Sequence, residues 1–408
     1  MTNFTGTTPQ SQPDLQRGTI PQTHGEGGKL PQERTLVDTQ ENTQGDTADN
    51  TADSTTDNTP GTTPANTTAK TLTFVVPAYN MEQYLERCVA SLIDTPDTGD
   101  IEVLIVDDGS SDTTPELADR LQAAHPGVVR AIHQPNKGHG GAVNTGIREA
   151  AGMYVKVVDA DDWVGKASLS QVMETLRAQR FEREPIDLLV TDYVYDKVGK
   201  RNKHVVHFSN VMDANRRLSW DDLRHFGIAQ YMIMHALTFR TAVVRESGMI
   251  LPEHTFYVDF IYSYQPFPWV RRLMYLDTPF YHYFIGREGQ SVQTDVMIRR
   301  VRQLQLVNHL MLEATPERGT VPDGLYRYMI HFLSINSVVT SVFLILSRDR
   351  ENYRQKDRLW HDIDVTSPQI GHDVRHKLVS RAINLHGRTG RFIIRHGYSI
   401  AEHVVGFN

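Results

Sequence analysis

Between residues 71 and 163, short apolar runs of strand character alternate with segments of helical spacing, and this alternation constrains the fold most. The predicted strands are Thr71–Val76, Ile101–Val106, 128–133 and 153–158. The predicted helices between them are 81–93, 112–124 and 139–151. Strands that alternate with helices predict a parallel sheet covered by helices on both faces. In such sheets ligands bind at the carboxyl ends of the strands.

Three of these strand ends carry turn-forming or acidic residues: Pro77–Asn80, Asp107–Ser111 and Asp159–Asp162. In the first, Pro77, Ala78, Tyr79 and Asn80 offer a turn with a fixed φ, an aromatic face and an amide. In the second, an Asp-Gly turn followed by a serine cap positions Asp108 to accept a hydrogen bond from a nucleobase N–H. The same residues are also typical of an ordinary turn and helix cap. The two interpretations are compatible, because such a turn would fix the Asp108 carboxylate in place.

The third strand end places Asp159, Asp161 and Asp162 within four residues. Carboxylates this close repel one another, and a divalent cation that bridges to phosphate removes that cost. Mg²⁺ and Mn²⁺ take hard oxygen ligands, usually one or two carboxylates with substrate phosphates and water. Because the cluster follows a buried strand, in line with two other polar strand ends, we favour a cation site over a solvated turn.

Residues 136–144 are rich in glycine and precede a predicted helix. Glycine permits close backbone approach, and a helix N-terminus favours anions. The segment is neither a Walker A loop, since no Gly-Lys-Ser/Thr is present, nor a Rossmann fingerprint, since it does not follow the first strand.

The four motifs together resemble the family 2 glycosyltransferases with the GT-A fold. The elements that match, in order, are Val75–Asn80, Val106–Ser110, Asn136–Asn144 and Asp159–Trp163. The similarity is clear over residues 72–165 and patchier to about residue 290. It implies an α/β fold with a mixed, mainly parallel sheet flanked by helices, followed by a helical C-terminal region.

The resemblance also implies a nucleotide sugar donor, usually a UDP-sugar, and Mn²⁺ or Mg²⁺ as cofactor. Pro77, Tyr79 and Asp108 would hold the uridine, Asp159 would lie near the ribose, and Asp161 would be the main metal ligand with Asp159 beside it. The remaining donor-binding positions that it implies are Ala78, Asn80, Asn136, Lys137, Asn144 and Ala160.

In this family an aspartate beyond the metal motif deprotonates the acceptor hydroxyl, and the best match here is Asp259. Val258 stands where glutamate is common, and the other interpretation of Asp259 is a helix cap. Val143 stands where many relatives have an arginine that contacts the donor, so we expect Lys137 or Arg287 to supply that charge. The lone histidines His139 and His235 are more typical of packing than of a site.

Residues 1–70 contain 18 threonines and almost no aliphatic clusters, which predicts a disordered tail. We therefore expect a glycosyltransferase domain over 71–295 and a mostly helical region over 296–408. The tail has nine acidic and four basic residues, so it contributes -5 to the net charge of -7. A negative net charge is not typical of a nucleic-acid-binding protein, and no such partner is expected.

The first residues form neither a basic nor an apolar leader segment, so the cytoplasm is the expected compartment. The single cysteine, Cys88, lies on an apolar helical stripe and is expected in the core.

Residues 328–347 lack charged side chains, but their serines, asparagine and helical apolar stripe favour a buried helix over a membrane span. The last 38 residues hold six Lys/Arg, two Asp/Glu and five His. They are typical of a solvated capping helix, or alternatively of a surface that touches the inner face of a membrane, where lipid-linked acceptors reside.

The sequence thus predicts an inverting, metal-dependent glycosyltransferase that uses a saccharide or lipid-linked acceptor in cell-surface polysaccharide synthesis. Two alternatives stay open: a non-catalytic nucleotide-sugar-binding protein and a nucleotidyltransferase on a similar sheet. A nucleotidyltransferase would have a glycine-rich loop with Arg or Lys after the first strand. This chain has Pro77–Asn80 there, which disfavours that alternative.

Overall fold

The computed structural model describes residues 69–197, 203–286, 293–385 and 387–405. Residues 64–408 form one compact unit. The predicted tail falls almost wholly outside the described residues, as does Arg287.

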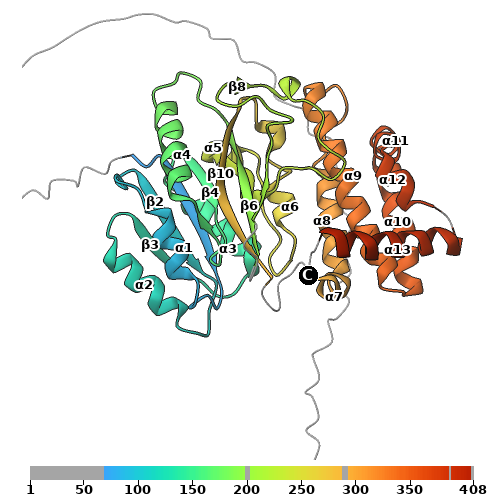
Figure 1. The fold of residues 1–408 in the computed structure, drawn as a ribbon, viewed down its shortest axis with the longest axis horizontal. Coiled ribbons are helices and arrows are strands. Elements are labelled where there is room, and N and C mark those ends of the chain that lie inside the picture. Colours follow the sequence, from blue (N-terminus) through green and yellow to red (C-terminus); the bar gives the residue numbers. More distant parts are fainter. Residues whose placement is uncertain (1–68, 198–202, 287–292, 386, 406–408) are drawn as a thin grey trace, which may run out of the picture. The chain divides into compact units, whose positions relative to one another are not determined.

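The first half of the sheet is parallel, as the sequence predicted (Figure 1). Its strands, in the spatial order β3-β2-β1-β4, are β1 (Leu72–Ala78), β2 (Ile101–Asp107), β3 (Val129–His133) and β4 (Tyr154–Val157). The connecting helices are α1 (Leu85–Leu92), α2 (Thr114–Ala124) and α3 (Gly138–Glu149). Every residue of β1 and β2 is buried, because helices and loops cover both faces of this part of the sheet.

The second half of the sheet is mixed. β9 (Leu237–Arg240) is antiparallel to both of its neighbours and separates β4 from β6 (Leu188–Lys197). β10 (Leu273–Ile285) runs parallel to β6 and antiparallel to the short β5 (Trp163–Val164). β9 has only four residues, which is too short for a periodic signal in the sequence. The remaining elements of this half are β7 (His204–Val206), β8 (Arg217–Leu218), α4 (Lys166–Gln179), α5 (Thr241–Glu246), α6 (Asp259–Tyr262) and the 3₁₀ turns η1 (Trp220–Asp222), η2 (Met234–Ala236) and η3 (Phe267–Trp269).

The chain after residue 293 is helical, and Figure 1 shows these helices gathered on the side of the sheet that carries α6. They are α7 (Thr294–Arg299), α8 (Val301–Glu313), α9 (Asp323–Leu346), α10 (Arg350–Thr366), α11 (Pro368–Arg375), α12 (Leu378–Ile383) and α13 (Gly387–Val405).

α9 is the one described helix that is long and apolar enough to cross a membrane, yet 72% of its apolar window is buried inside the protein. Its small polar residues face neighbouring helices. Asn308 donates to Asn336 and Ser337 at 2.8 and 2.9 Å, and the Trp360 indole donates to Ser341 at 3.0 Å. α9 is therefore a core helix of the C-terminal region, in agreement with the prediction from sequence.

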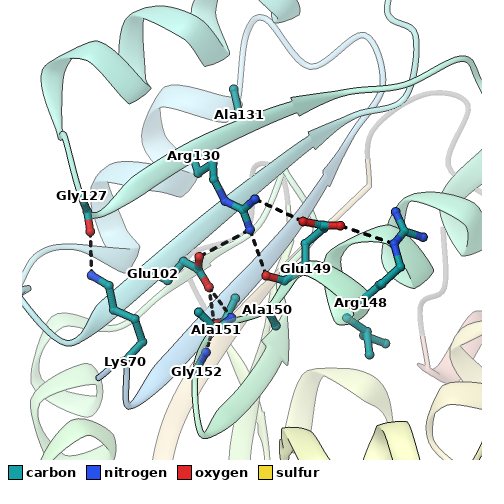
Figure 2. Close-up of polar contacts among 12 residues, drawn as sticks. Lys70, Glu102, Gly127, Arg130, Ala131, Arg148, Glu149, Ala150, Ala151 and Gly152 are labelled. Atoms are coloured by element: carbon teal, nitrogen blue, oxygen red, sulfur yellow. Dashed lines mark hydrogen bonds and ion pairs between the residues drawn. The ribbon is translucent and has the colours of Figure 1, made fainter. Parts of the chain in front are cut away.

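Charged side chains also gather where the parallel strands begin, and Figure 2 shows that they pair with one another. Glu102 accepts hydrogen bonds from Thr73 and the Ala151 N–H and pairs with Arg130 at 3.6 Å. Arg130 also pairs with Glu149 at 3.3 Å. This edge of the sheet is thus closed by internal pairing, which leaves the opposite edge for a ligand.

Candidate active site

The parallel register brings the polar strand ends to one edge of the sheet. Ala78 lies opposite Asp107, and Val75 lies opposite Val157. The Asp108 N–H donates to the Ala78 carbonyl at 2.9 Å, so the ends of β1 and β2 remain joined beyond the strands. The residues that follow β1, β2 and β4 are therefore neighbours, as the sequence predicted.

Asp108 is buried and held in one orientation. Its Oδ1 accepts hydrogen bonds from the Gln134 side chain at 2.7 Å and from the Lys137 N–H at 2.9 Å. The Asn136 amide donates to the Asp108 carbonyl at 2.9 Å. Among the described residues no contact engages Oδ2, so that oxygen can still accept from a ligand. Gln134 was missed by the sequence analysis because it lies between two motifs.

Of the two residues that follow β1, Tyr79 is exposed and Asn80 anchors a neighbouring loop. Pro77 and Ala78 are buried within β1, whereas the Tyr79 ring is 48% exposed beside Asp108. Asn80 adopts a left-handed φ of 55°, and its side-chain oxygen accepts from the Ser111 N–H at 2.8 Å. Asn80 thus joins the loops after β1 and β2, and its contact with the donor stays a prediction.

The acidic loop after β4 is anchored from beneath by α1. Arg87 donates to the Asp161 carbonyl at 2.6 Å, and the buried Cys88 thiol contacts the Asp159 carbonyl at 3.6 Å. Cys88 is a core residue, as predicted. Ala160 is buried, so its contribution is to shape the loop.

Asp162, which the sequence analysis did not assign as a ligand, is the most enclosed carboxylate of this loop. It is fully buried and accepts from the Tyr281 hydroxyl at 2.5 Å and from the Phe284 N–H at 2.7 Å. Burial raises the pKa of Asp162 well above its ordinary range, and the charges of Asp161 and Asp159 add to that effect. Since Tyr281 and Phe284 lie on β10, Asp162 ties the acidic loop to the second half of the sheet.

His139 lies at the start of α3 and contacts the acidic loop directly, with Nε2 at 2.8 Å from Asp159 Oδ1. Burial lowers the pKa of His139, but the negative charge and hydrogen bond of Asp159 outweigh it, and the pKa is raised on balance. The charges of Asp259 and Asp161 contribute in the same direction. His139 therefore lies against the acidic loop, whereas its lone position in the sequence favoured a packing role.

Asp259 is the first residue of α6, and Tyr257, two residues before it, adopts a left-handed conformation with φ of 66°. Burial raises the pKa of Asp259 to about 6, His139 opposes the shift, and the charge of Asp159 reinforces it. Because His139 and Asp259 each shift the pKa of the other, the predicted base lies at the same edge of the sheet as the acidic loop.

The glycine-rich segment holds the loop that leads to Asp259. A Cβ on Gly140 would lie 2.5 Å from the Pro252 carbonyl oxygen, so only glycine allows this approach. The Asn144 amide both donates to the Leu251 carbonyl and accepts from its N–H, at 2.8 and 3.0 Å. Lys137 pairs with Glu253 at 3.4 Å. Asn144 therefore holds the loop that leads to Asp259, and both polar atoms of its side chain are used in the contact with Leu251.

The two departures from the family pattern have a steric explanation. Val143 is fully buried on α3, and Val258 is 2% exposed before α6. Both side chains belong to the hydrophobic core, where arginine or glutamate would be buried without a partner. Arg287, which was expected to supply the missing charge, lies outside the described residues.

Comparison with known proteins accounts for this arrangement. Residues 73–239, which contain all three polar strand ends, match the family model described as glycosyl transferase family 2. Residues 73–239 are therefore a glycosyltransferase family 2 domain. Its fold resembles that of Staphylococcus aureus TarS residues 1–349 in complex with UDP-GlcNAc, with a TM-score of 0.58 at 19% identity over 80% of this chain and 92% of the TarS chain.

Curated relatives of this glycosyltransferase include the uncharacterized glycosyltransferase EpsJ of Bacillus subtilis (strain 168), 28% identical over 55% of this chain and 63% of EpsJ. The putative glycosyltransferase EpsH of the same strain is 27% identical over 52% of this chain and 60% of EpsH. Chondroitin synthase of Escherichia coli is 39% identical over 26% of this chain and 15% of that protein. The match thus spans about three-fifths of the length of EpsJ and EpsH.

Proposed function

We propose that this glycosyltransferase moves a sugar from a UDP-sugar to a saccharide or lipid-linked acceptor, with inversion at the anomeric carbon and with help from a divalent cation. The observation that carries the proposal is that Asp259, a half-buried carboxylate at the start of α6, lies close enough to His139 and Asp159 for their charges to affect its pKa.

Donor recognition in this proposal begins with Asp108. Its oriented carboxylate can accept the N3–H of uracil, which gives the charge-assisted hydrogen bond that selects a base with an N–H at that position. The exposed Tyr79 ring offers the base an apolar face to stack on. The N-terminus of α3, with its glycines, faces the acidic loop through His139 and suits the diphosphate.

The residues present fit a divalent cation. Asp159 and Asp161 supply the hard oxygen ligands that Mn²⁺ and Mg²⁺ prefer. Asp159, Asp162 and His235 each offer a ligand atom, and these atoms lie within 4.8 Å of one another. When bound, such a cation neutralises the charge that develops on the departing diphosphate. GT-A enzymes generally depend on a divalent metal, and this donor set agrees with that.

Asp259 is proposed to remove the proton from the acceptor hydroxyl as that oxygen attacks the anomeric carbon from the face opposite the diphosphate. Its pKa of about 6 leaves it ionised at neutral pH while keeping it basic enough to take a proton. His139 bonds to Asp159, and the charges of Asp159 and Asp259 both raise its pKa, so its protonated form would limit the repulsion between these carboxylates.

Relatives named chondroitin synthase and hyaluronan synthase support a role in surface polysaccharide synthesis for this chain. Within the proposal, the enzyme acts in the cytoplasm at the inner face of the membrane, with a peripheral contact through its basic C-terminus. A vesicle flotation assay with anionic lipid, comparing the full chain with a truncation after residue 386, tests that contact.

The central test compares UDP binding with transfer. UDP with Mn²⁺ is expected to raise the melting temperature, and Asp161→Ala to abolish the rise. Asp259→Asn is expected to leave the UDP shift near normal and to remove transfer, measured as acceptor-dependent release of UDP in a screen of nucleotide sugars. Absence of a shift with every nucleotide in the presence of metal contradicts the donor site. Transfer retained by Asp259→Asn shows that another group takes the proton.

A further inference from the structure

His235 is a buried histidine whose ring nitrogens have no hydrogen-bond partner among the described residues. The residue lies in η2, immediately before β9, and is only 5% exposed. Buried imidazole nitrogens are normally paired, because leaving them unpaired costs the hydration that they had in water. Each such exception in a folded protein needs a cause.

The surroundings hold the ring in place. Tyr281 and Tyr283 pack against it with centroids 4.5 and 4.3 Å away, and Tyr193 lies at 6.0 Å. The Lys156 ammonium donates to the His235 carbonyl at 2.8 Å and fixes its backbone. The imidazole is therefore oriented by contacts that leave its nitrogens free.

His235 Nε2 lies 4.0 Å from Asp162 Oδ2, which is too long for a hydrogen bond. Two atoms that each lie about 2.1 Å from one cation can be up to about 4.2 Å apart, so this gap is short enough for both atoms to bind one ion. Asp159 completes the set, with the three ligand atoms within 4.8 Å of one another.

We infer that His235 would be a nitrogen ligand of the divalent cation that the acidic loop holds in the proposed function, together with Asp159 and Asp162. The inference rests on the proposed function only in that the same cation serves the donor. It explains why a buried imidazole has no partner among the described residues, and it adds a ligand from η2 to a site that the sequence assigned wholly to residues 159–161.

A nitrogen ligand has a consequence for which metal the site selects. Imidazole suits transition metals, whereas Mg²⁺ prefers sites made of oxygen alone. With His235 in place, the site is expected to bind Mn²⁺ at least about tenfold more tightly than Mg²⁺, since a nitrogen ligand favours the transition metal. His235→Gln, whose side-chain oxygen has about the reach of the imidazole Nε2, is expected to reduce that preference.

The test uses Mn²⁺ as a spectroscopic probe of the full chain, with and without UDP. Pulsed electron paramagnetic resonance detects the nuclei bound to Mn²⁺, and the wild type is expected to show coupling to one ¹⁴N that is lost in His235→Ala. His139→Ala tests the other nearby imidazole and is expected to keep the signal. His207→Ala is the matched control, because His207 belongs to a separate Asp–His cluster in which it already bonds to Asp192 at 2.7 Å.

Bound Mn²⁺ without ¹⁴N coupling in the wild type overturns the inference and leaves the proposed function standing. Coupling that survives His235→Ala but disappears in His139→Ala also overturns it. If the wild type fails to bind Mn²⁺ even with UDP, the metal-dependent function itself is wrong. Because the first measurement is made on the wild type, a variant that does not fold leaves the inference open to refutation.

Discussion

The lysine beneath the acidic loop makes the stability of this protein depend on pH in an unusual direction. Lys156 lies on β4 with no exposed surface, and its ammonium donates to the carbonyls of His235 and Leu237 at 2.8 and 3.2 Å. No carboxylate pairs with it among the described residues. Burial lowers the pKa of Lys156 from 10.5 to about 7, because the charged form loses its hydration.

The sign of the effect follows from proton binding. Between pH 7 and pH 10.5 the unfolded chain carries the proton on Lys156 and the folded protein largely does not, so the free energy of unfolding rises with pH. Each pH unit in this window adds about 1.4 kcal/mol, and the gain from pH 7 to pH 10 is roughly 3.5 kcal/mol. The gain is complete above the unfolded pKa and is lost as the pH falls through the folded pKa.

Lys156→Met removes the titrating group and keeps the length of the side chain. The change also leaves two carbonyls without a donor, at a cost of about 1–3 kcal/mol each, but this cost does not vary with pH. Denaturant unfolding between pH 7 and pH 10 is therefore expected to show the stability of the variant falling behind that of the wild type as the pH rises. The control is Lys166→Met, whose side chain is 70% exposed, and it is expected to follow the wild type. Parallel curves for Lys156→Met and the wild type refute the argument.

Three further outcomes are expected. The rate of transfer is expected to rise as the pH increases through about 6, because Asp259 must lose its proton to act as a base. A kcat/KM that does not fall as the pH is lowered below about 6 contradicts this role. Gly146→Ala places a Cβ 2.1 Å from Val75 Cγ1 and is expected to lower the free energy of unfolding by about 1–3 kcal/mol, measured by denaturant unfolding. The double variant Gly146→Ala with Val75→Ala removes this clash and is expected to recover part of the loss. Asn144→Ala releases Leu251 and is expected to lower kcat while UDP affinity, measured by calorimetry, changes little; an equal loss of both assigns Asn144 to the donor.

Sequence alone predicted the parallel half of the sheet and its ligand-binding edge. Signals for these features are local: an apolar run identifies each strand, and the polar residues that follow identify its end. Asp108, Asp159 and Asp259 were found in this way or through the family resemblance, and the structure gathers them at one edge.

Tertiary structure decided which polar residues face a ligand and which hold loops. Asn80 and Asn144 have the composition of binding residues, yet their amides are engaged by Ser111 and Leu251, which lie 31 and 107 positions away. In the sequence His235 looked like a packing residue. Only the fold shows that its two ring nitrogens have no hydrogen-bond partner among the described residues and that the ring lies near the carboxylates of Asp159 and Asp162. The physical reason is that a strand end is a local property of the chain, whereas the satisfaction of a buried polar atom depends on residues brought together from distant segments.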